Sequence, residues 1–368
     1  MSRLKIEFNV LDRQYRMYAD EYKQAAIRVL ESGQYILGQE VENFELKYAK
    51  YTGSKYCVGV NSGLDALVLA FRALGINKGD EVIVPANTYI ASVLAITENG
   101  AIPIFVEPDE YHNLDDRKIE DAITNRTKAI LVVHLYGQAA NIRKIKEIVD
   151  KYNLFLVEDC AQSHGSKFDG QLTGTFGDIG CFSFFPTKNL GAFGDSGAII
   201  TDNQAIADLV RMLRNYGSKV KYQYEIEGVN SRLDELQAAL LSSKLSHLSE
   251  LTQDRVRIAM RYLKEIKNTR INMPITRDMV DHVYHLFVVQ CKERDDFQKY
   301  LLECGIKTQI HYPIPPHLAE CYRRLGFGMG DFPITEKYAN EVISLPLYNG
   351  MTDEEIDYVV EAVNKWSK

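Results

Sequence analysis

Short apolar runs of strand character alternate with helical segments over the first 200 residues, and this alternation limits the fold more than any other feature. The helical runs follow an amphipathic stretch at 22–30 and lie at 64–74, 90–98, 142–152 and 206–213. The strand-like runs lie at 56–60, 81–85, 102–106, 129–135, 155–158, 180–185 and 198–201. Several of them are apolar throughout, as strands covered on both faces are. The pattern predicts an α/β domain with a mainly parallel central sheet.

The pattern changes near residue 232. From 232 to 266 it predicts one long helix, uninterrupted by proline, that bridges two domains. A strand at 282–291, a helix at 294–304, a strand at 308–311 and a terminal helix at 353–366 follow, as in a compact α+β unit. A chain of 368 residues is too long for one ordinary core. We therefore expect a large α/β domain at 1–245 and a small α+β domain at 246–368.

Composition excludes several classes of function. A net charge of −7 gives no support to binding of nucleic acid or of an anionic membrane. No apolar stretch approaches the ~20 residues of a membrane span, and the first residues lack a signal sequence, so a cytoplasmic protein is expected. The six cysteines show no paired spacing, which favours reduced core thiols and no metal site.

Lys188 lies between an aromatic run, 182–185, and a glycine-rich segment, 191–197. A lysine is usually a solvated surface charge, because burying an ammonium is costly. Here the neighbours are not those of an exposed helix. A desolvated lysine has a lowered pKa and forms a Schiff base with a carbonyl. The position predicts a nucleophile.

Asp159 follows the predicted strand 155–158, at the edge where open α/β sheets bind ligands. Pyridoxal phosphate requires an acid that keeps its ring nitrogen protonated, and Asp159 is a candidate for that role. The alternative is a helix cap for the residues that follow. Glu158 points to the opposite face of the strand and is interpreted as structural.

A turn at Gly63 and Leu64 joins a strand to a helix, so its backbone N–H groups face outward at the positive end of a helix dipole. Such a turn can hold a phosphate, although it can also serve only to cap the helix. Ser183 is a candidate for a further phosphate contact. Its alternative is a strand serine bonded to the backbone.

Three further positions carry polar aromatic or imidazole groups. Tyr89 leaves a strand end and is a candidate to stack on a flat ring, or else a packing residue. His311 and Tyr312 belong to a proline-rich loop, 310–317, that lines a binding site or forms a structural turn. Tyr222 belongs to 216–224, where two lysines stand among three tyrosines. That segment suits an anionic ring-bearing substrate, or is an exposed loop.

Seven motifs together resemble the DegT/DnrJ/EryC1/StrS family of pyridoxal-phosphate-dependent nucleotide-sugar aminotransferases. They occur in order over nearly the whole chain, at 61–67, 84–89, 134–137, 158–165, 182–190, 230–239 and 311–317. The resemblance implies the type I fold of the aspartate aminotransferase-like enzymes. It also implies a homodimer whose active sites lie at the subunit interface.

The resemblance assigns roles to individual residues. Lys188 matches the lysine that binds pyridoxal phosphate as a Schiff base and moves the proton. Asp159 matches the residue at the pyridine nitrogen, Gln162 the one near the ring hydroxyl, and Tyr89 the stacking residue, with Ala161 on the other ring face. The phosphate contacts match Gly63, Leu64 and Ser183. Asn230 matches an asparagine supplied by the partner subunit, and the candidates for substrate binding are His311, Tyr312 and Tyr222.

The segment 190–197 narrows the expected substrate. It resembles the members that transfer the amino group of L-glutamate to C3 of a dTDP-linked 3-keto-6-deoxyhexose, which implies a role in surface-polysaccharide or O-antigen synthesis. Amination at C4 of a 4-keto sugar is the first alternative. A pyridoxal-phosphate-binding regulatory protein without turnover and an ordinary amino-acid aminotransferase are the others.

Overall fold

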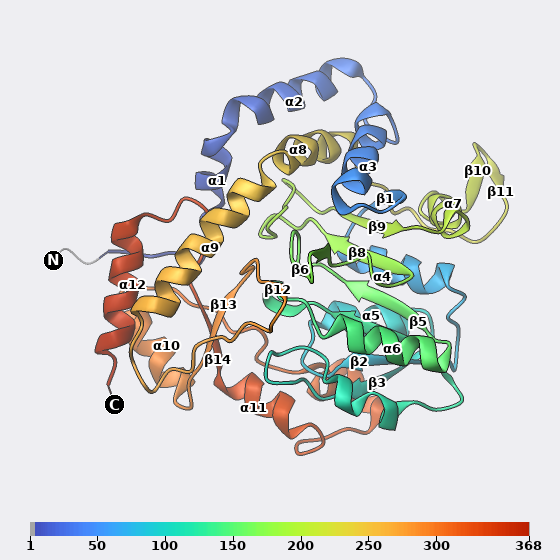
Figure 1. The fold of residues 1–368 in the computed structure, drawn as a ribbon. Coiled ribbons are helices and arrows are strands. Elements are labelled where there is room, and N and C mark those ends of the chain that lie inside the picture. Colours follow the sequence, from blue (N-terminus) through green and yellow to red (C-terminus); the bar gives the residue numbers. More distant parts are fainter. Residues whose placement is uncertain (1–3, 368) are drawn as a thin grey trace.

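A seven-stranded sheet forms the centre of the computed structural model, which describes residues 4–367 (Figure 1). The strand order across the sheet is β1-β9-β8-β5-β4-β2-β3. In chain order the strands are β1 (Tyr56–Val60), β2 (Glu81–Pro85), β3 (Ile102–Val106), β4 (Thr127–Val133), β5 (Phe155–Asp159), β8 (Ile179–Ser183) and β9 (Gly197–Thr201). All seven predicted strands are therefore present; three have the predicted ends, and the ends of the other four differ by at most two residues.

One strand runs against the others. The pairs β2–β3, β2–β4, β4–β5 and β5–β8 are parallel, whereas β9 is antiparallel to both β8 and β1. The prediction of a mainly parallel sheet is confirmed. Because six strands share one direction, their carboxyl ends meet at a single edge, where an open α/β sheet presents its ligand site.

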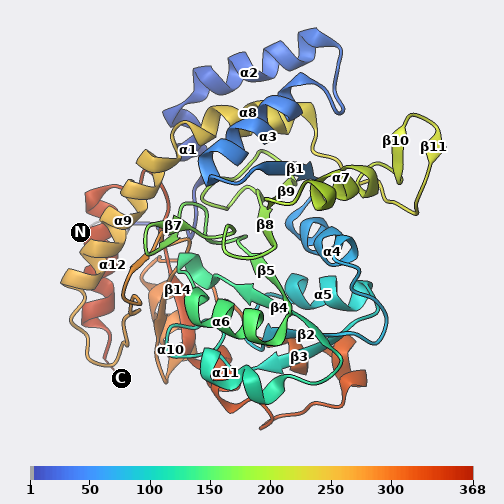
Figure 2. The same ribbon diagram turned by 45° about the vertical axis from the view of Figure 1, so that its right-hand side comes forward.

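Helices cover both faces of the sheet (Figures 1 and 2). One face packs against α4 (Gly63–Ala73), α5 (Ile90–Glu98) and α7 (Gln204–Leu213), and the other against α3 (Gln39–Thr52), α6 (Ile142–Tyr152) and α8 (Glu235–Leu245). Val82 and Val84 face the first layer and Ile83 the second, as strand alternation requires. None of the helices within 4–367 combines the length and apolar character needed to cross a bilayer.

The prediction of one continuous helix over 232–266 is wrong. The chain forms two helices, α8 and α9 (Leu248–Glu265), separated by Ser246 and His247. His247 stacks on Tyr18, with ring centroids 3.7 Å apart, and its Nε2 lies 2.9 Å from Glu21. These contacts with the N-terminal helices α1 (Leu11–Met17) and α2 (Ala19–Ser32) hold the break between the two helices. Long-range packing here overrides local helical preference.

A second core forms around α9, α10 (Arg294–Glu303) and α12 (Asp353–Lys365). The predicted strand 282–291 is only partly formed, as β13 (Phe287–Gln290), which pairs with β14 (Val342–Leu345). Residues before β13 instead bond to the turn after β4, where the N–H groups of Val283 and Leu286 donate to Gly137 and Tyr136. The predicted strand 308–311 is reduced to one bridge, Gln309 with Ser344.

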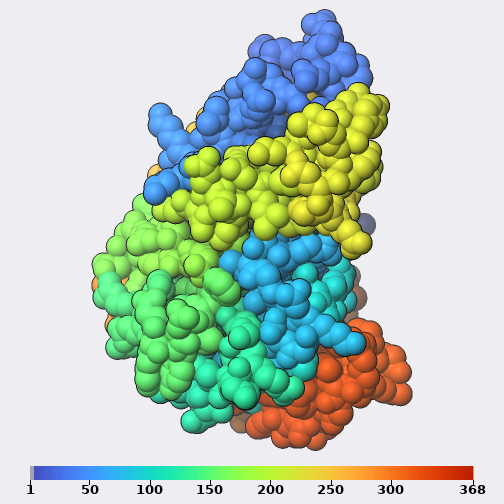
Figure 3. Space-filling model, turned by 90° about the vertical axis from the view of Figure 1, so that its right-hand side faces the viewer, coloured from blue at the N-terminus to red at the C-terminus, as the bar shows by residue number. Residues whose placement is uncertain are grey.

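The two cores exchange segments of chain. Ile6 pairs with Ile306 and lies in the second core. Conversely, Tyr322 packs into the first core, and the segment around it lies against β3, where Phe327 and Phe332 contact the ring of Phe105. This part of the chain is orange at the bottom of Figure 3. This segment precedes α11 (Pro333–Glu341). The division at residue 245 stays a prediction.

A carboxylate from α8 caps the start of α3. Glu235 is 2% exposed and accepts hydrogen bonds from the N–H groups of Gly38, Glu40 and Val41, at 2.7, 2.9 and 3.0 Å. The first N–H groups of a helix have no partner within the helix, and a negative charge there also meets the positive end of the dipole. Glu235 therefore joins α3 to α8 by charge as well as by packing.

We expect Glu235→Ala to lower the free energy of unfolding by about 3 kcal/mol, because three N–H donors lose their acceptor. Denaturant unfolding followed by circular dichroism measures the change. The matched control is Glu361→Ala, which removes an exposed partner of Lys365 and should change stability by less than about 0.5 kcal/mol. Equal effects of the two substitutions would contradict the capping role.

Candidate active site

A cavity of about 1160 Å³ opens at the carboxyl edge of the sheet. Segments far apart in the sequence line it, because the strands β1, β2, β5 and β8 all end there. The structure brings nine of the predicted site residues to its wall: Gly63, Leu64, Tyr89, Asp159, Gln162, Ser183, Lys188, His311 and Tyr312. Ala161 joins them.

Lys188 lies on the loop between β8 and β9. Its own N–H donates to the carbonyl of Phe185, and the loop closes where Ala192 N–H donates to Phe184. No hydrogen bond or ion pair within residues 4–367 occupies the Lys188 ammonium. Burial lowers the pKa of Lys188 to about 8, against the opposing charge of Asp159. Such an amine is available as a nucleophile near neutral pH.

Asp159 ends β5 and is buried. Its Oδ2 accepts from Ser92 on α5 at 2.8 Å, and its Oδ1 accepts from the N–H of Ala161 at 3.1 Å. The second bond is part of the capping role considered as an alternative. Burial raises the pKa of the Asp159 carboxyl, while the Ala161 and Ser92 hydrogen bonds and the Lys188 charge act in the opposite direction. A cationic group in the cavity would favour the ionised carboxylate further.

Gly63 is the first residue of α4 and faces Ser183. A Cβ at Gly63 would lie 2.5 Å from the Cβ of Ser183, so only glycine fits. Ser62 caps the helix by accepting from Asp65 N–H, and no hydrogen bond within 4–367 uses the N–H groups of Gly63 and Leu64. Free N–H groups at the start of an eleven-residue helix, beside a serine, suit a phosphate.

Aromatic and amide groups form another wall of the cavity. Tyr89 precedes α5 and lies against Tyr312, with ring centroids 5.0 Å apart. The amide of Gln162 is held at both ends, since Oε1 accepts from Tyr136 N–H at 2.7 Å and Nε2 donates to the Tyr312 hydroxyl at 2.9 Å. The ring of Tyr89 is half exposed and faces open space.

Two histidines line the cavity beside Lys188. Burial and the Lys188 charge lower the pKa of His311 to about 4, and its Nδ1 bonds to the Ser344 hydroxyl. His285 was not identified from the sequence. Asn189 Nδ2 donates to the carbonyl of Val283, so its Oδ1 faces His285 and accepts from Nδ1 at 3.2 Å. His285 is neutral, because burial and the Lys188 charge hold its pKa well below 6.5.

His164 supports Ser183 from behind and was also not identified from the sequence. Its Nε2 donates to the carbonyl of Ser183 at 2.8 Å, so its Nδ1 accepts from the Tyr48 hydroxyl at 3.1 Å. Burial lowers the pKa of His164 to about 3, which keeps the ring neutral. The sequence offered one indication of this position, since His164 follows the candidate residue Asp159 by five residues.

Two predicted site residues lie away from the cavity wall. Tyr222 is 75% exposed at the turn between β10 (Ser218–Val220) and β11 (Gln223–Tyr224). Asn230 is exposed and forms a bridge with Asn215. Neither lines the cavity within the chain itself. The participation of both residues stays a prediction.

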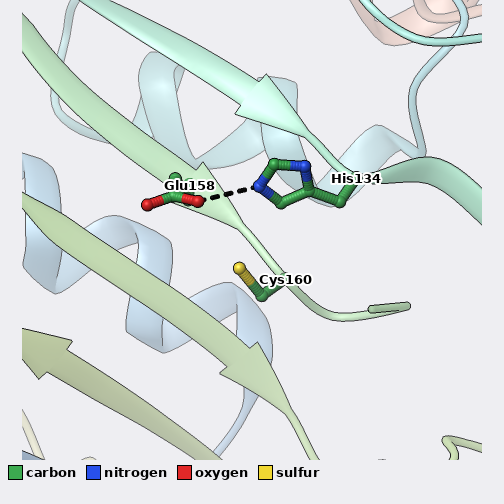
Figure 4. A group of neighbouring side chains, drawn as sticks. All are labelled: His134, Glu158 and Cys160. Atoms are coloured by element: carbon green, nitrogen blue, oxygen red, sulfur yellow. Dashed lines mark hydrogen bonds and ion pairs between the residues drawn. The ribbon is translucent and has the colours of Figure 1, made fainter. Parts of the chain in front are cut away.

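His134, Glu158 and Cys160 lie side by side behind the cavity, with ligand-type atoms within 4.8 Å of one another (Figure 4). Ala140 N–H donates to His134 Nδ1, so His134 Nε2 carries the proton that it donates to Glu158 at 2.9 Å. The Glu158 carboxylate also accepts from the N–H groups of Gly174, Phe176 and Gly177. Burial raises the pKa of the Cys160 thiol. Hydrogen bonds thus already occupy the groups that would bind a metal.

The cavity suits pyridoxal phosphate by three independent features. Glycine at position 63 leaves a space opposite Ser183 that suits a phosphate. The amine of Lys188 suits an aldehyde, and the buried carboxyl of Asp159 suits a protonated ring nitrogen. A mainly parallel sheet with such a site at its carboxyl edge is typical of the type I pyridoxal-phosphate-dependent aminotransferases.

The chain belongs to the DegT/DnrJ/EryC1/StrS aminotransferase family, whose model matches residues 17–364. The sequence is 55% identical over 356 residues to the dTDP-3-amino-3,6-dideoxy-alpha-D-galactopyranose transaminase of Aneurinibacillus thermoaerophilus. That match covers 96% of this chain and 98% of the relative. The family predicted from the motifs is confirmed.

Solved structures agree with the type I fold. The crystal structure of DesV from S. venezuelae in complex with a ketimine intermediate superimposes with a TM-score of 0.97, at 45% identity, covering 98% of each chain. NtdA from Bacillus subtilis, with the cofactor PMP bound, gives a TM-score of 0.91 at 33% identity and covers 98% of this chain and 84% of that one. The predicted fold and cofactor are confirmed.

We expect the amine of Lys188 in the cofactor-free protein to titrate near pH 8, well below 10.5, because burial disfavours the ammonium. Its labelling by acetic anhydride, followed by mass spectrometry, should rise through pH 8. Asp159→Asn removes the charge that favours the ammonium and should shift this midpoint lower. Exposed Lys264 serves as the internal reference. A Lys188 midpoint near 10.5 would contradict the effect of burial.

Proposed function

We propose that this enzyme transfers the amino group of L-glutamate to C3 of a dTDP-linked 3-keto-6-deoxyhexose, giving a dTDP-3-amino-3,6-dideoxyhexose. The observation that carries the reaction type is the half-buried amine of Lys188, which has no partner among residues 4–367 and lines the same cavity as the turn at Gly63. The name of the Aneurinibacillus relative supports the substrate. The segment 190–197, of which Asp195 and Ser196 line the cavity, supports amination at C3.

Pyridoxal phosphate supplies an aldehyde and an electron-accepting ring to this reaction. Lys188 would hold the cofactor through its aldehyde, and its amine would carry the proton at the substrate carbon. Asp159 would stabilise the protonated ring nitrogen. The phosphate would be bound by Gly63, Leu64 and Ser183. Tyr89 and Ala161 would contact the ring, and Gln162 its hydroxyl group.

Glutamate and the keto sugar use the same cavity in turn, so the kinetics are expected to be ping-pong. His311 and Tyr312 contact the sugar at the cavity wall. Both are held in place from behind, His311 by Ser344 and Tyr312 by Gln162. Their fixed positions favour one orientation of the sugar ring.

The enzyme acts as a homodimer, with Asn230 of each subunit directed to the partner's site, and Tyr222 binds substrate. Exposed apolar side chains near these residues are consistent with a covered surface, including Tyr216, Val220 and Tyr224. A cytoplasmic location and a role in O-antigen synthesis follow from the sequence and stay predictions.

Lys188→Ala should lower the rate of amino transfer at least about 1000-fold, because both the covalent link and the proton carrier are lost. Turnover is measured as loss of glutamate in the presence of the keto sugar. Borohydride should fix the cofactor to the unaltered enzyme and not to the variant. Lys264→Ala is the control. Normal turnover of Lys188→Ala would overturn the proposed function.

Defined dTDP-linked 3-keto and 4-keto sugars separate amination at C3 from amination at C4. We expect turnover with the 3-keto sugar and a product whose NMR spectrum places nitrogen on C3. Preferred turnover of the 4-keto sugar would establish the alternative. If glutamate is not consumed with either sugar, the alternative of a regulatory protein without turnover would be favoured.

Sharing of sites between subunits can be tested by complementation. Lys188→Ala and Asn230→Ala subunits, each weakly active alone, are unfolded and refolded together. If Asn230 acts in the partner's site, mixed dimers hold one intact site, and activity returns to about a quarter of the unaltered value. No recovery in dimers shown to be mixed would contradict sharing.

A further inference from the structure

The loop that carries Lys188 has two anchors, and both follow that residue in the chain. Asn189 is fixed by Val283 and His285, which hold its two amide atoms. Three residues beyond Lys188, Gly191 folds back on the loop, where a Cβ would lie 2.4 Å from the carbonyl oxygen of Pro186. The second anchor is the bond that the Gly191 carbonyl accepts from Lys244.

Lys244 lies near the end of α8 and is 3% exposed. Its Nζ donates to the carbonyl of Gly191 at 2.9 Å and to Oε1 of Gln14 at 2.6 Å. No carboxylate within residues 4–367 forms an ion pair with it. The ammonium is thus buried with only neutral acceptors.

A buried ammonium without a counter-ion is costly for folding. Burial lowers the pKa of Lys244 to about 7, and the charge of Arg255 acts in the same direction. Arg255 is itself 5% exposed, and its hydrogen bonds go to the backbone carbonyls of Tyr284, His285 and Leu347. A methionine would fill the place of Lys244 at lower cost. Buried charged residues that break the usual rules of core packing concentrate at functional sites.

We propose that Lys244 is a positioning residue for Lys188, which it holds through the carbonyl of Gly191. Lys244 does not line the cavity, so it acts through the loop and not on the substrate. The proposal rests on the proposed role of Lys188 in amino transfer. Loss of the contact removes the anchor at Gly191 and leaves the one at Asn189, so the amine stays in the cavity but departs from its reactive position.

The test is Lys244→Met in the cofactor-saturated enzyme. We expect kcat to fall about tenfold or more, since small misplacements of a reacting group reduce rates strongly, with KM for the keto sugar changed less than about threefold. The midpoint of thermal unfolding should stay the same or rise, because a buried charge is removed. Hydrogen exchange of residues 185–192 in the cofactor-free protein should become faster.

Two further variants sharpen the result. Lys264→Met removes an exposed lysine of α9 and should leave kcat and exchange unchanged. Gln14→Ala removes the second acceptor of Lys244 but keeps the contact with Gly191, so kcat should stay within about twofold. A fall in kcat for Gln14→Ala as large as that for Lys244→Met would overturn the role of Gly191.

A folded Lys244→Met variant with unaltered kcat and unaltered exchange of 185–192 would overturn the proposal. If this variant does not fold, Lys244→Gln, which is shorter and uncharged, takes its place with the same expectations. Failure of the proposed function would be seen in a separate experiment, because the Lys188→Ala variant, in which Lys244 is intact, would then still transfer the amino group. The exchange measurement needs neither cofactor nor substrate.

Discussion

Desolvation of the basic groups at the loop of Lys188 and behind it is the constraint on which the rest of the site depends. Lys188, Lys244 and Arg255 are all desolvated, and burial lowers the pKa of each. The same environment keeps the neighbouring histidines, His164, His285 and His311, neutral. An anionic ligand therefore enters a cavity whose surroundings already favour negative charge, and the amine of Lys188 approaches its reactive form without any base touching it.

The reversed strand β9 makes this arrangement possible. Because β9 returns antiparallel beside β8, the loop 184–196 that joins them holds Lys188 at the ligand-binding edge of the sheet. The parallel strands bring Asp159 from β5 and the turn at Gly63 after β1 to that same edge. The amine, the carboxylate and the turn at Gly63 thus follow three different strands, and the helices packed on the sheet fix the positions of these strands.

Local pattern was sufficient for the sheet and for the residues at strand ends, since periodicity and the common edge of parallel strands follow from neighbouring residues. It failed where distant contacts decide the outcome. The break between α8 and α9 depends on stacking of His247 with Tyr18, more than 200 residues earlier. The sequence pattern placed His285 in a strand. In the structure the backbone of this segment is hydrogen-bonded instead to the turn at Tyr136 and Gly137. The burial of Lys244 likewise comes from distant contacts, with the loop at Gly191 and with Gln14, which the local helical pattern does not contain.

The pairing of Ile6 with Ile306 has a consequence for how the molecule is made. The N–H of Ile6 donates to the carbonyl of Gly305, and the carbonyl of Ile6 accepts from the N–H of Lys307, so this contact joins residues 300 positions apart. A ribosome adding about 5–20 residues per second needs roughly 15–60 s to reach the partner of Ile6. Once residue 201 is made, the sheet has all of its strands, while the second core still lacks its later helices and Ile6 still lacks its partner. Synthesis therefore completes the strands on both sides of Lys188 about 100 residues before the partner of Ile6.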